Sequence, residues 1–220
     1  YTSGSTGTPK GVELTHANFV FITYSGVNSM PDIAMKPNRR LLLFLPLAHV
    51  FARYMQFFCF AGNVSLGLSS NLKTILADFK AFKPTFILAV PRIFEKIYNA
   101  ASQKAGAGFK GRVFADATQT AYDWSHAQQS GGSIPLALNA KHALYNKLVY
   151  SSIMEVFGGH VEYAVSGGAP LDSSIAHFFN GVGLPLLEGY GMTETCAPSS
   201  VNPTEGYKIG TIGLPLQGVT

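Results

Sequence analysis

The sequence is poor in cysteine, in charge and in long apolar runs, and each shortage excludes a class of protein. Its 220 residues include only two cysteines, too few for a disulfide framework, so we expect a reducing, cytoplasmic location. Charged residues make up 13%, about half of the ~25% in an average soluble domain, but hydrophobic residues make up 47%, which excludes intrinsic disorder. The most apolar stretch, residues 41–68, is broken by Pro46, His49 and Arg53 and lacks the ~18 consecutive apolar residues of a membrane span.

Acidic side chains are scarce in one segment. The net charge is +4 overall, but it is +6 in residues 73–112 and −5 in residues 113–220. The basic residues of the positive segment are Lys73, Lys80, Lys83, Arg92, Lys96, Lys104, Lys110 and Arg112. Such a segment fits a solvated helical surface, or contact with phosphates or an anionic membrane face, so peripheral membrane contact stays open. No aromatic residues interleave with these charges in a nucleic-acid-binding pattern, so we expect no nucleic-acid partner.

Short apolar runs bounded by prolines, charges or turn residues predict buried strands. The runs are residues 40–46, 84–91, 161–165 and 184–187. Between the last two, Asp172 can cap a helix that Asn180-Gly181 would end. The alternation of strand and helix predicts an α/β fold with a parallel, doubly wound sheet layered with helices.

Residues 92–157 predict a layer of helices packed on this sheet. Helical patterns over 92–105, Phe109–Gln129 and the segment after Pro135 are separated by glycine-rich breaks. In the last helix an apolar stripe with helical spacing predicts the buried face. The stripe consists of Leu138, Tyr145, Val149, Ser152 and Val156.

Residues 1–11, YTSGSTGTPKG, contain five hydroxyl side chains, three glycines and one lysine. Glycine-rich backbone can direct several N–H groups at one anion, and the hydroxyls and the lysine add donors and charge, so this segment predicts a polyphosphate-binding loop. The Walker pattern G-x-x-x-x-G-K-[ST] does not fit, because Gly11 follows Lys10. The first residue is Tyr1 and not Met, and the sequence begins inside this glycine-rich loop, so we expect the chain to be a piece of a longer protein.

This loop resembles the phosphate-binding signature of the adenylate-forming superfamily, which includes acyl-CoA synthetases, luciferases and peptide-synthetase adenylation domains. Residues 166–171 (SGGAPL) and 189–195 (GYGMTET) are similar to two further signatures, in the family's order. Residues 45–51 (LPLAHVF) and 90–96 (VPRIFEK) resemble the long-chain fatty acid–CoA ligase branch more particularly. The resemblance covers the whole chain.

The resemblance implies that residues 1–220 form the central part of an N-terminal AMP-binding domain. Within it, 1–11 would be the phosphate-binding loop, 92–157 the helical layer and 161–195 the adenine and magnesium region. The family's hinge and its C-terminal domain with a catalytic lysine are absent from these 220 residues, so we expect the piece alone to be inactive.

The implied reaction joins a long-chain fatty acid to the α-phosphate of Mg·ATP and then transfers the acyl group to coenzyme A. The implied catalytic residues are Thr193, Glu194, His49 and Lys10. Of these, Glu194 would hold Mg²⁺, Thr193 would bond the α-phosphate, and His49 would lie near the acyl carboxylate. The implied nucleotide-binding residues are Thr2, Ser3, Gly4, Ser5, Thr6, Gly7, Thr8, Lys10, Gly168, Ala169, Pro170, Glu188, Gly189, Tyr190, Gly191 and Thr193.

Several of these residues have plainer interpretations. His49 could be a satisfied core histidine, Tyr190 a buried aromatic residue and Glu194 a solvated loop carboxylate, while Glu188 could touch either adenine or the sheet. Five phenylalanines could wall an acyl tunnel or simply belong to the core. They are Phe44, Phe51, Phe57, Phe58 and Phe60.

Three other functions remain as alternatives. The chain could belong to an adenylate-forming ligase for another carboxylic acid, or it could be a non-catalytic nucleotide- or acyl-binding fragment. A remote alternative is a serine hydrolase, because residues 164–168 (AVSGG) nearly match G-x-S-x-G around Ser166. The later Asp172 and His177 follow the triad order, but they lie on one short predicted helix, which is the wrong spacing.

Overall fold

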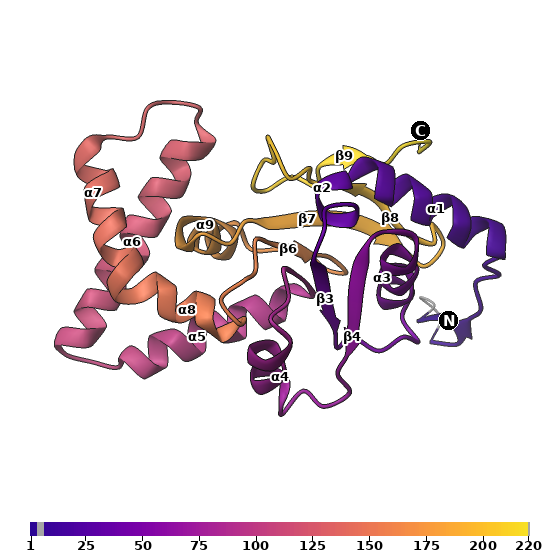
Figure 1. Cartoon of the computed structure of the whole chain (residues 1–220), viewed down its shortest axis with the longest axis horizontal. Coiled ribbons are helices and arrows are strands. Elements are labelled where there is room, and N and C mark those ends of the chain that lie inside the picture. The colour runs from indigo at the N-terminus through magenta and orange to yellow at the C-terminus, as the bar shows by residue number, and fades with distance from the viewer. Residues whose placement is uncertain (4–6, 220) are drawn as a thin grey trace.

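The computed structural model describes residues 1–3 and 7–219, in which seven strands form a central sheet (Figure 1). The strands are β3 (Arg39–Leu43), β4 (Val64–Leu68), β5 (Phe86–Ala89), β6 (Tyr163–Ser166), β7 (Leu186–Met192), β8 (Ala197–Val201) and β9 (Leu214–Pro215). Their order is β4-β3-β5-β6-β7-β8-β9, and the first five are parallel. The predicted α/β class with a mostly parallel sheet is confirmed.

The antiparallel end of the sheet was not predicted. Strand β8 pairs antiparallel with β7, and β9 pairs antiparallel with β8. The β8 sequence, APSSV, contains a proline and two serines and lacks the apolar pattern of a strand. The β4 sequence, VSLGL, was missed for a related reason, because Gly67 interrupts a short strand that lies at the sheet edge.

Alternate side chains of the parallel strands enter two different cores. On one face, Leu42, Ile87 and Ala164 pack in the first core, and on the other face, Leu41 and Leu88 pack in the second. Strand β5 is buried along its whole length. Continuous apolar runs therefore predicted strands correctly here, because helices cover both faces of the sheet.

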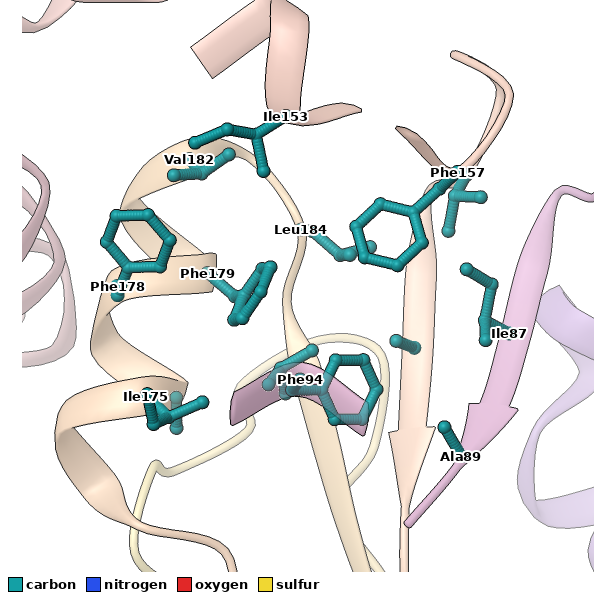
Figure 2. Packing of buried hydrophobic residues seen from close by; sticks show 14 of the residues in the cluster. Ile87, Ala89, Phe94, Ile153, Phe157, Ile175, Phe178, Phe179, Val182 and Leu184 are labelled. Atoms are coloured by element: carbon teal, nitrogen blue, oxygen red, sulfur yellow. The ribbon is translucent and has the colours of Figure 1, made fainter. Parts of the chain in front are cut away.

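The second core is covered by α1 (His16–Ser29), α2 (Pro31–Ala34) and α3 (Val50–Ala61). The opposite face packs against α4 (Ile75–Phe82), α5 (Pro91–Ala105), α8 (Ser151–Val156) and α9 (Ser173–Val182). Figure 2 shows Phe94 and Phe157 beside Ile87 and Ala89 of the sheet. Farther out, α6 (Phe109–Gln129) and α7 (Leu136–Tyr145) lie beyond α9 in Figure 1. None of the helices in the described ranges is both long enough and apolar enough to cross a bilayer.

Helix α9 begins as predicted, because the Asp172 side chain accepts a hydrogen bond from the Ser174 N–H at 2.7 Å. Its end differs from the prediction, since the left-handed residue is Gly183, with φ +99°, and not Asn180-Gly181. Gly181 serves packing instead. A Cβ there would overlap the Ala121 carbonyl oxygen, so its absence lets α6 approach α9 closely.

The predicted stripe after Pro135 is only partly correct. Tyr145 and Val149 are half-buried, but Ser152 is exposed, and the fully buried residues farther along are Ile153 and Phe157. A π-helical turn at Asn146–Tyr150 separates α7 from α8. A π turn holds more residues than an α turn, so it rotates the buried face relative to a regular 3.6-residue repeat.

Candidate active site

The carboxyl ends of three neighbouring parallel strands bring the sequence motifs to one edge of the sheet. In the register, Ala89 of β5 pairs with Ser166 of β6, and Ser166 pairs with Glu188 of β7. The segments that follow these residues, at 90–96, 167–171 and 189–195, therefore begin side by side. Open α/β sheets bind their ligands at this kind of edge.

A cavity of about 430 Å³ opens at this edge and is called here the motif cavity. Its walls include six of the sequence-predicted site residues: His49, Gly168, Gly189, Tyr190, Gly191 and Thr193. Its interior is apolar and is lined by Met30 and Ile33 from the α1–α2 region and by Met55 and Phe58 of α3. The cavity thus joins a polar rim formed by motif loops to an apolar interior.

A second cavity, of about 710 Å³, lies between α1 and α3 and is called the helix cavity. It shares His49, Val50 and Thr193 with the motif cavity, so the two hollows meet at these residues. Tyr1 also lines the helix cavity. The amino-terminal segment and the 189–195 motif, which are far apart in the sequence, therefore border the same hollow.

The backbone around Gly191 leaves no room for a side chain. A Cβ at this position would overlap the Ala197 carbonyl oxygen and lie 2.8 Å from the Pro198 Cα. The pairing of β7 with β8 shifts register between Tyr190 and Gly191, as at a β-bulge. Glycine at this position thus lets the antiparallel strand approach closely enough to close one side of the site.

Hydrogen bonds made by Thr195 hold the turn that carries Thr193 and Glu194 in place. Thr195 receives a hydrogen bond from the Met192 N–H at 3.0 Å and donates to the Ala197 carbonyl oxygen at 2.8 Å. Cys196 and Ala197 have φ values of +58° and +93°, a left-handed region that side-chain-bearing residues rarely adopt. Such conformations cost roughly 1–3 kcal/mol each, so surrounding contacts must hold this turn in place.

The surroundings of three of these residues bear on the plainer interpretations. The Oε1 of Glu188 accepts a hydrogen bond from the Leu171 N–H at 3.1 Å and so links the 166–171 loop to β7, while a contact with adenine stays a prediction. Tyr190 is 47% exposed and therefore not a buried aromatic residue. His49 is exposed and borders both cavities, so it is not a core histidine.

Glu194 is exposed, and the solvated-carboxylate interpretation stays open for it. Within the described ranges no group of three or more His, Cys, Asp or Glu residues could hold a metal ion. A single carboxylate is a hard oxygen ligand, and Mg²⁺ is commonly held by one or two carboxylates together with substrate phosphates. Glu194 follows Thr193 of the cavity wall directly, so its position fits that role.

The amino-terminal segment forms a small hairpin. Strand β1 (Thr2–Ser3) pairs antiparallel with β2 (Pro9–Lys10), with Thr2 opposite Lys10. Gly7, Thr8 and Lys10 are exposed, whereas Gly4, Ser5 and Thr6 lie outside the described residues. Ala169 and Pro170 are also exposed and directly follow Gly168. A chain reversal rich in exposed donors fits a phosphate chain. Among the described residues of 1–11, Tyr1 lines the helix cavity and the others line neither of the two cavities.

The phenylalanines divide among three surroundings. Phe51 and Phe58 line the motif cavity, Phe57 and Phe60 line the helix cavity, and Phe44 belongs to the core. The sequence did not single out Ile33 or Tyr54, which also line the motif cavity. Burial raises the pKa of the Tyr54 phenol, so its hydroxyl stays protonated at neutral pH. No local pattern could have found these two, because α2 and α3 meet only in the folded chain.

The serine-hydrolase alternative is wrong. Ser166 is fully buried, and its Oγ has no hydrogen-bond partner among the described residues. Asp172 caps α9, and the Nδ1 of His177 bonds the Ser125 Oγ at 2.9 Å. A nucleophile needs a base within hydrogen-bond reach and access to substrate, and Ser166 has neither.

The topology and the cavity define an α/β domain with a ligand site at the carboxyl edge of its parallel strands. The sequence model of the family described as "AMP-binding enzyme" matches residues 1–220. The chain belongs to this AMP-binding enzyme family.

Known proteins agree with this assignment. The chain is 45% identical over 218 residues to long-chain-fatty-acid–CoA ligase FadD15 of Mycobacterium bovis, covering 99% of this chain and 36% of the relative. It is 34% identical over 225 residues to long chain acyl-CoA synthetase 3 of Arabidopsis thaliana, covering 100% and 33%. It thus spans about a third of the length of these relatives.

A solved structure shares the fold. The o-succinylbenzoate coenzyme A synthetase MenE from Bacillus subtilis, solved in complex with ATP and magnesium ion, superimposes with a TM-score of 0.62 at 21% identity. The match covers 99% of this chain and 35% of that one.

Proposed function

We propose that the protein of which these residues are part is a long-chain fatty acid–CoA ligase that forms an acyl-adenylate from ATP. The observation that carries the proposal is the motif cavity, in which segments from four sequence motifs, at 45–51, 90–96, 166–171 and 189–195, border one apolar hollow. The 45% identity to a mycobacterial ligase of this name, over 99% of the chain, supports the same reaction.

The rim of the motif cavity suits a carboxylate that must meet a phosphate. Two anions repel each other, so catalysis depends on holding them together and neutralising their charge. His49 and Thr193 would orient the fatty carboxylate and the α-phosphate where the two cavities meet. The apolar lining beyond them, at Ile33, Met55 and Phe58, would take the acyl chain.

The remaining motif residues would bind the nucleotide. Tyr190 would stack on adenine with its exposed ring, and residues 168–170 would form the opposite wall. The hydroxyls and Lys10 of the hairpin would hold the β- and γ-phosphates. Mg²⁺ held by Glu194 would neutralise phosphate charge when it is bound.

The proposed reaction has two steps. The fatty carboxylate oxygen attacks the α-phosphorus and releases pyrophosphate, and the thiol sulfur of coenzyme A next attacks the acyl carbon and releases AMP. The substrates would be ATP, a fatty acid and coenzyme A. Any contact with a membrane would be peripheral.

The test is acid-dependent ATP–pyrophosphate exchange and acyl-CoA formation by the full-length protein, with acids from acetate to stearate. We expect the ratio kcat/KM to rise toward long chains, because each buried CH₂ contributes about 0.8 kcal/mol. Preference for acetate or an aromatic acid would favour a ligase for another carboxylic acid, and nucleotide binding without exchange would favour a non-catalytic protein.

A further inference from the structure

The loop between β4 and α4, together with the outer side of α4, forms a surface separate from the candidate active site. Helix α4 lies at the lower edge of the molecule in Figure 1, and the loop begins at the carboxyl end of the edge strand β4. None of the described residues 68–83 lines the motif cavity or the helix cavity. Three leucines on this segment are largely exposed, with Leu68 at 63%, Leu72 at 61% and Leu76 at 49%. Leu76 and Lys80 are four residues apart on α4 and so share one side of the helix. We call the segment 68–83 the α4 surface.

Positive charge surrounds these leucines. Lys73, Lys80 and Lys83 are all exposed, and no ion pair found in the described part of the chain involves them. The acid on this surface is Asp78, whose Oδ2 accepts hydrogen bonds from Ser69 at 2.6 Å and from Thr74 at 3.1 Å. Its carboxylate is thus partly engaged within the loop, and the lysines stay free for an outside partner.

A polar cavity of about 510 Å³ opens on the same segment, beside Leu68. Leu68, Ser69, Ser70 and Asn71 line it, together with Asp78 and Arg40. The guanidinium carbon of Arg40 lies 4.6 Å from the centroid of the Phe82 ring, and the Arg40 Nε is buried with no hydrogen-bond partner among the described residues. A cation with an unused donor beside several hydroxyl and amide groups suits a phosphate group.

We propose that the α4 surface docks on an anionic lipid bilayer, with a lipid phosphate in the polar cavity and the leucines inserted among the acyl chains. A soluble phosphate compound would use the cavity and the lysines but would leave the leucines in water. An anionic bilayer accounts for the lysines, the polar cavity and the exposed leucines together, because it offers negatively charged headgroups at its surface and an apolar interior beneath them. The charge of +6 over residues 73–112 extends the attraction beyond the loop.

The test is cosedimentation of the full-length protein with vesicles that contain phosphatidylglycerol and with vesicles of pure phosphatidylcholine. We expect binding to the anionic vesicles that weakens as salt is added. The double variant Leu72→Glu/Leu76→Glu should lower the affinity at least about tenfold, because two apolar side chains no longer insert. The variant Lys73→Glu/Lys80→Glu should lower it by a similar factor, since each lysine near the surface contributes roughly fivefold.

Matched controls come from the far end of the molecule. Leu136→Glu/Leu144→Glu on α7 removes two leucines that are at least as exposed on average, at 87% and 55%, and Lys147→Glu/Lys208→Glu removes two exposed lysines, and both variants should bind vesicles normally. Coenzyme A and inorganic phosphate, at matched ionic strength, should compete only for the polar cavity and the lysines, so they should weaken binding to the anionic vesicles without abolishing it, because the leucines stay inserted. The proposal is overturned if the wild type does not bind, if the α4 variants bind as well as the controls, or if free phosphate abolishes binding at matched ionic strength.

Discussion

The edge loops at the carboxyl end of the sheet, defined here as residues 166–172 and 188–202, and the helical region 92–157 are held in place by different forces. In the edge loops, single polar contacts and close backbone approaches fix each turn, as at Glu188, Gly191 and Thr195. In the helical region, aromatic rings pack against α9 and the sheet, for example Phe94 on Phe179 with centroids 5.6 Å apart. Changes in the edge loops should therefore affect activity more than folding, and changes in the helical core should do the reverse.

The largest effect is expected at Gly191→Ala, an edge-loop position whose close backbone approach also fixes strand β8 of the sheet. The new methyl group would overlap the Ala197 carbonyl oxygen, so β8 must move and the turn that carries Thr193 moves with it. We expect a loss of about 3 kcal/mol in the free energy of unfolding and at least a ~10²-fold loss of ATP–pyrophosphate exchange. Gly132→Ala, where the nearest atom is the Ser130 Oγ at 3.6 Å, is the control and should change neither quantity.

Phe157→Ala tests whether a change in the helical region affects folding more than activity. Phe157 is fully buried between the sheet and α9, with its ring centroid 6.2 Å from that of Phe179 (Figure 2). Denaturant unfolding should show a loss of about 3–5 kcal/mol, while kcat/KM per folded molecule stays near the wild-type value. Phe109→Ala, at a residue 77% exposed, should change stability by less than about 0.5 kcal/mol. A proportionate loss of kcat/KM in folded Phe157→Ala would mean that the helical region shapes the site directly.

Glu194→Ala tests whether a change in the edge loops affects activity more than folding. Its side chain is exposed and makes none of the hydrogen bonds that hold the turn, so removing it should leave the unfolding temperature unchanged. Loss of a charge-stabilising group should lower acid-dependent ATP–pyrophosphate exchange by about 10²–10³-fold. Glu205→Ala, at another exposed carboxylate in the next loop, is the matched control. Near-normal exchange in Glu194→Ala would remove this residue from the mechanism.

The smallest expected effect concerns pH and the contact between α6 and α9. Burial, and to a lesser extent the ring of His126 stacked 3.7 Å away, lower the pKa of His177 below its ordinary value of about 6.5. The unfolded chain therefore binds a proton more readily than the folded one, and stability present above pH ~6.5 is lost as the pH falls below it. Thermal unfolding of His177→Gln should depend less on pH between neutral and mildly acidic conditions. His160→Gln, at an exposed histidine, should keep the wild-type dependence.

Sequence patterns predicted the parts of the fold in which the local sequence and the tertiary environment favour the same structure. Strand β5 is apolar because both of its faces are buried, and Asp172 begins a helix because it can cap one. The meeting of residues 166–171 with 189–195 followed from the parallel order of β6 and β7. Strand β8 could not be predicted, because Pro198 and Ser200 enter the sheet only through the close approach that Gly191 permits.

The interior of the motif cavity also lay beyond the sequence. Ile33 and Met30 line it only because α1 and α2 cross over the sheet beside α3, and no local pattern specifies that crossing. The motif residues predicted which segments meet at the rim of the cavity, and their nucleotide-binding roles stay predictions. The depth of the cavity, on which the choice of acid would depend under the proposed function, comes from tertiary packing.

The central claim is that the fatty acid enters the motif cavity with its carboxylate at His49 and Thr193 and its chain toward Ile33. The most direct measurement is kcat/KM of the full-length Ile33→Phe variant across acids from acetate to stearate, expressed as ratios between chain lengths so that partial unfolding cancels. Ile33 is 1% exposed, so the larger ring must occupy space inside the cavity. We predict that the ratio of long-chain to short-chain activity falls at least about tenfold. An equal loss for every acid, or no change in the ratio, would contradict the claim.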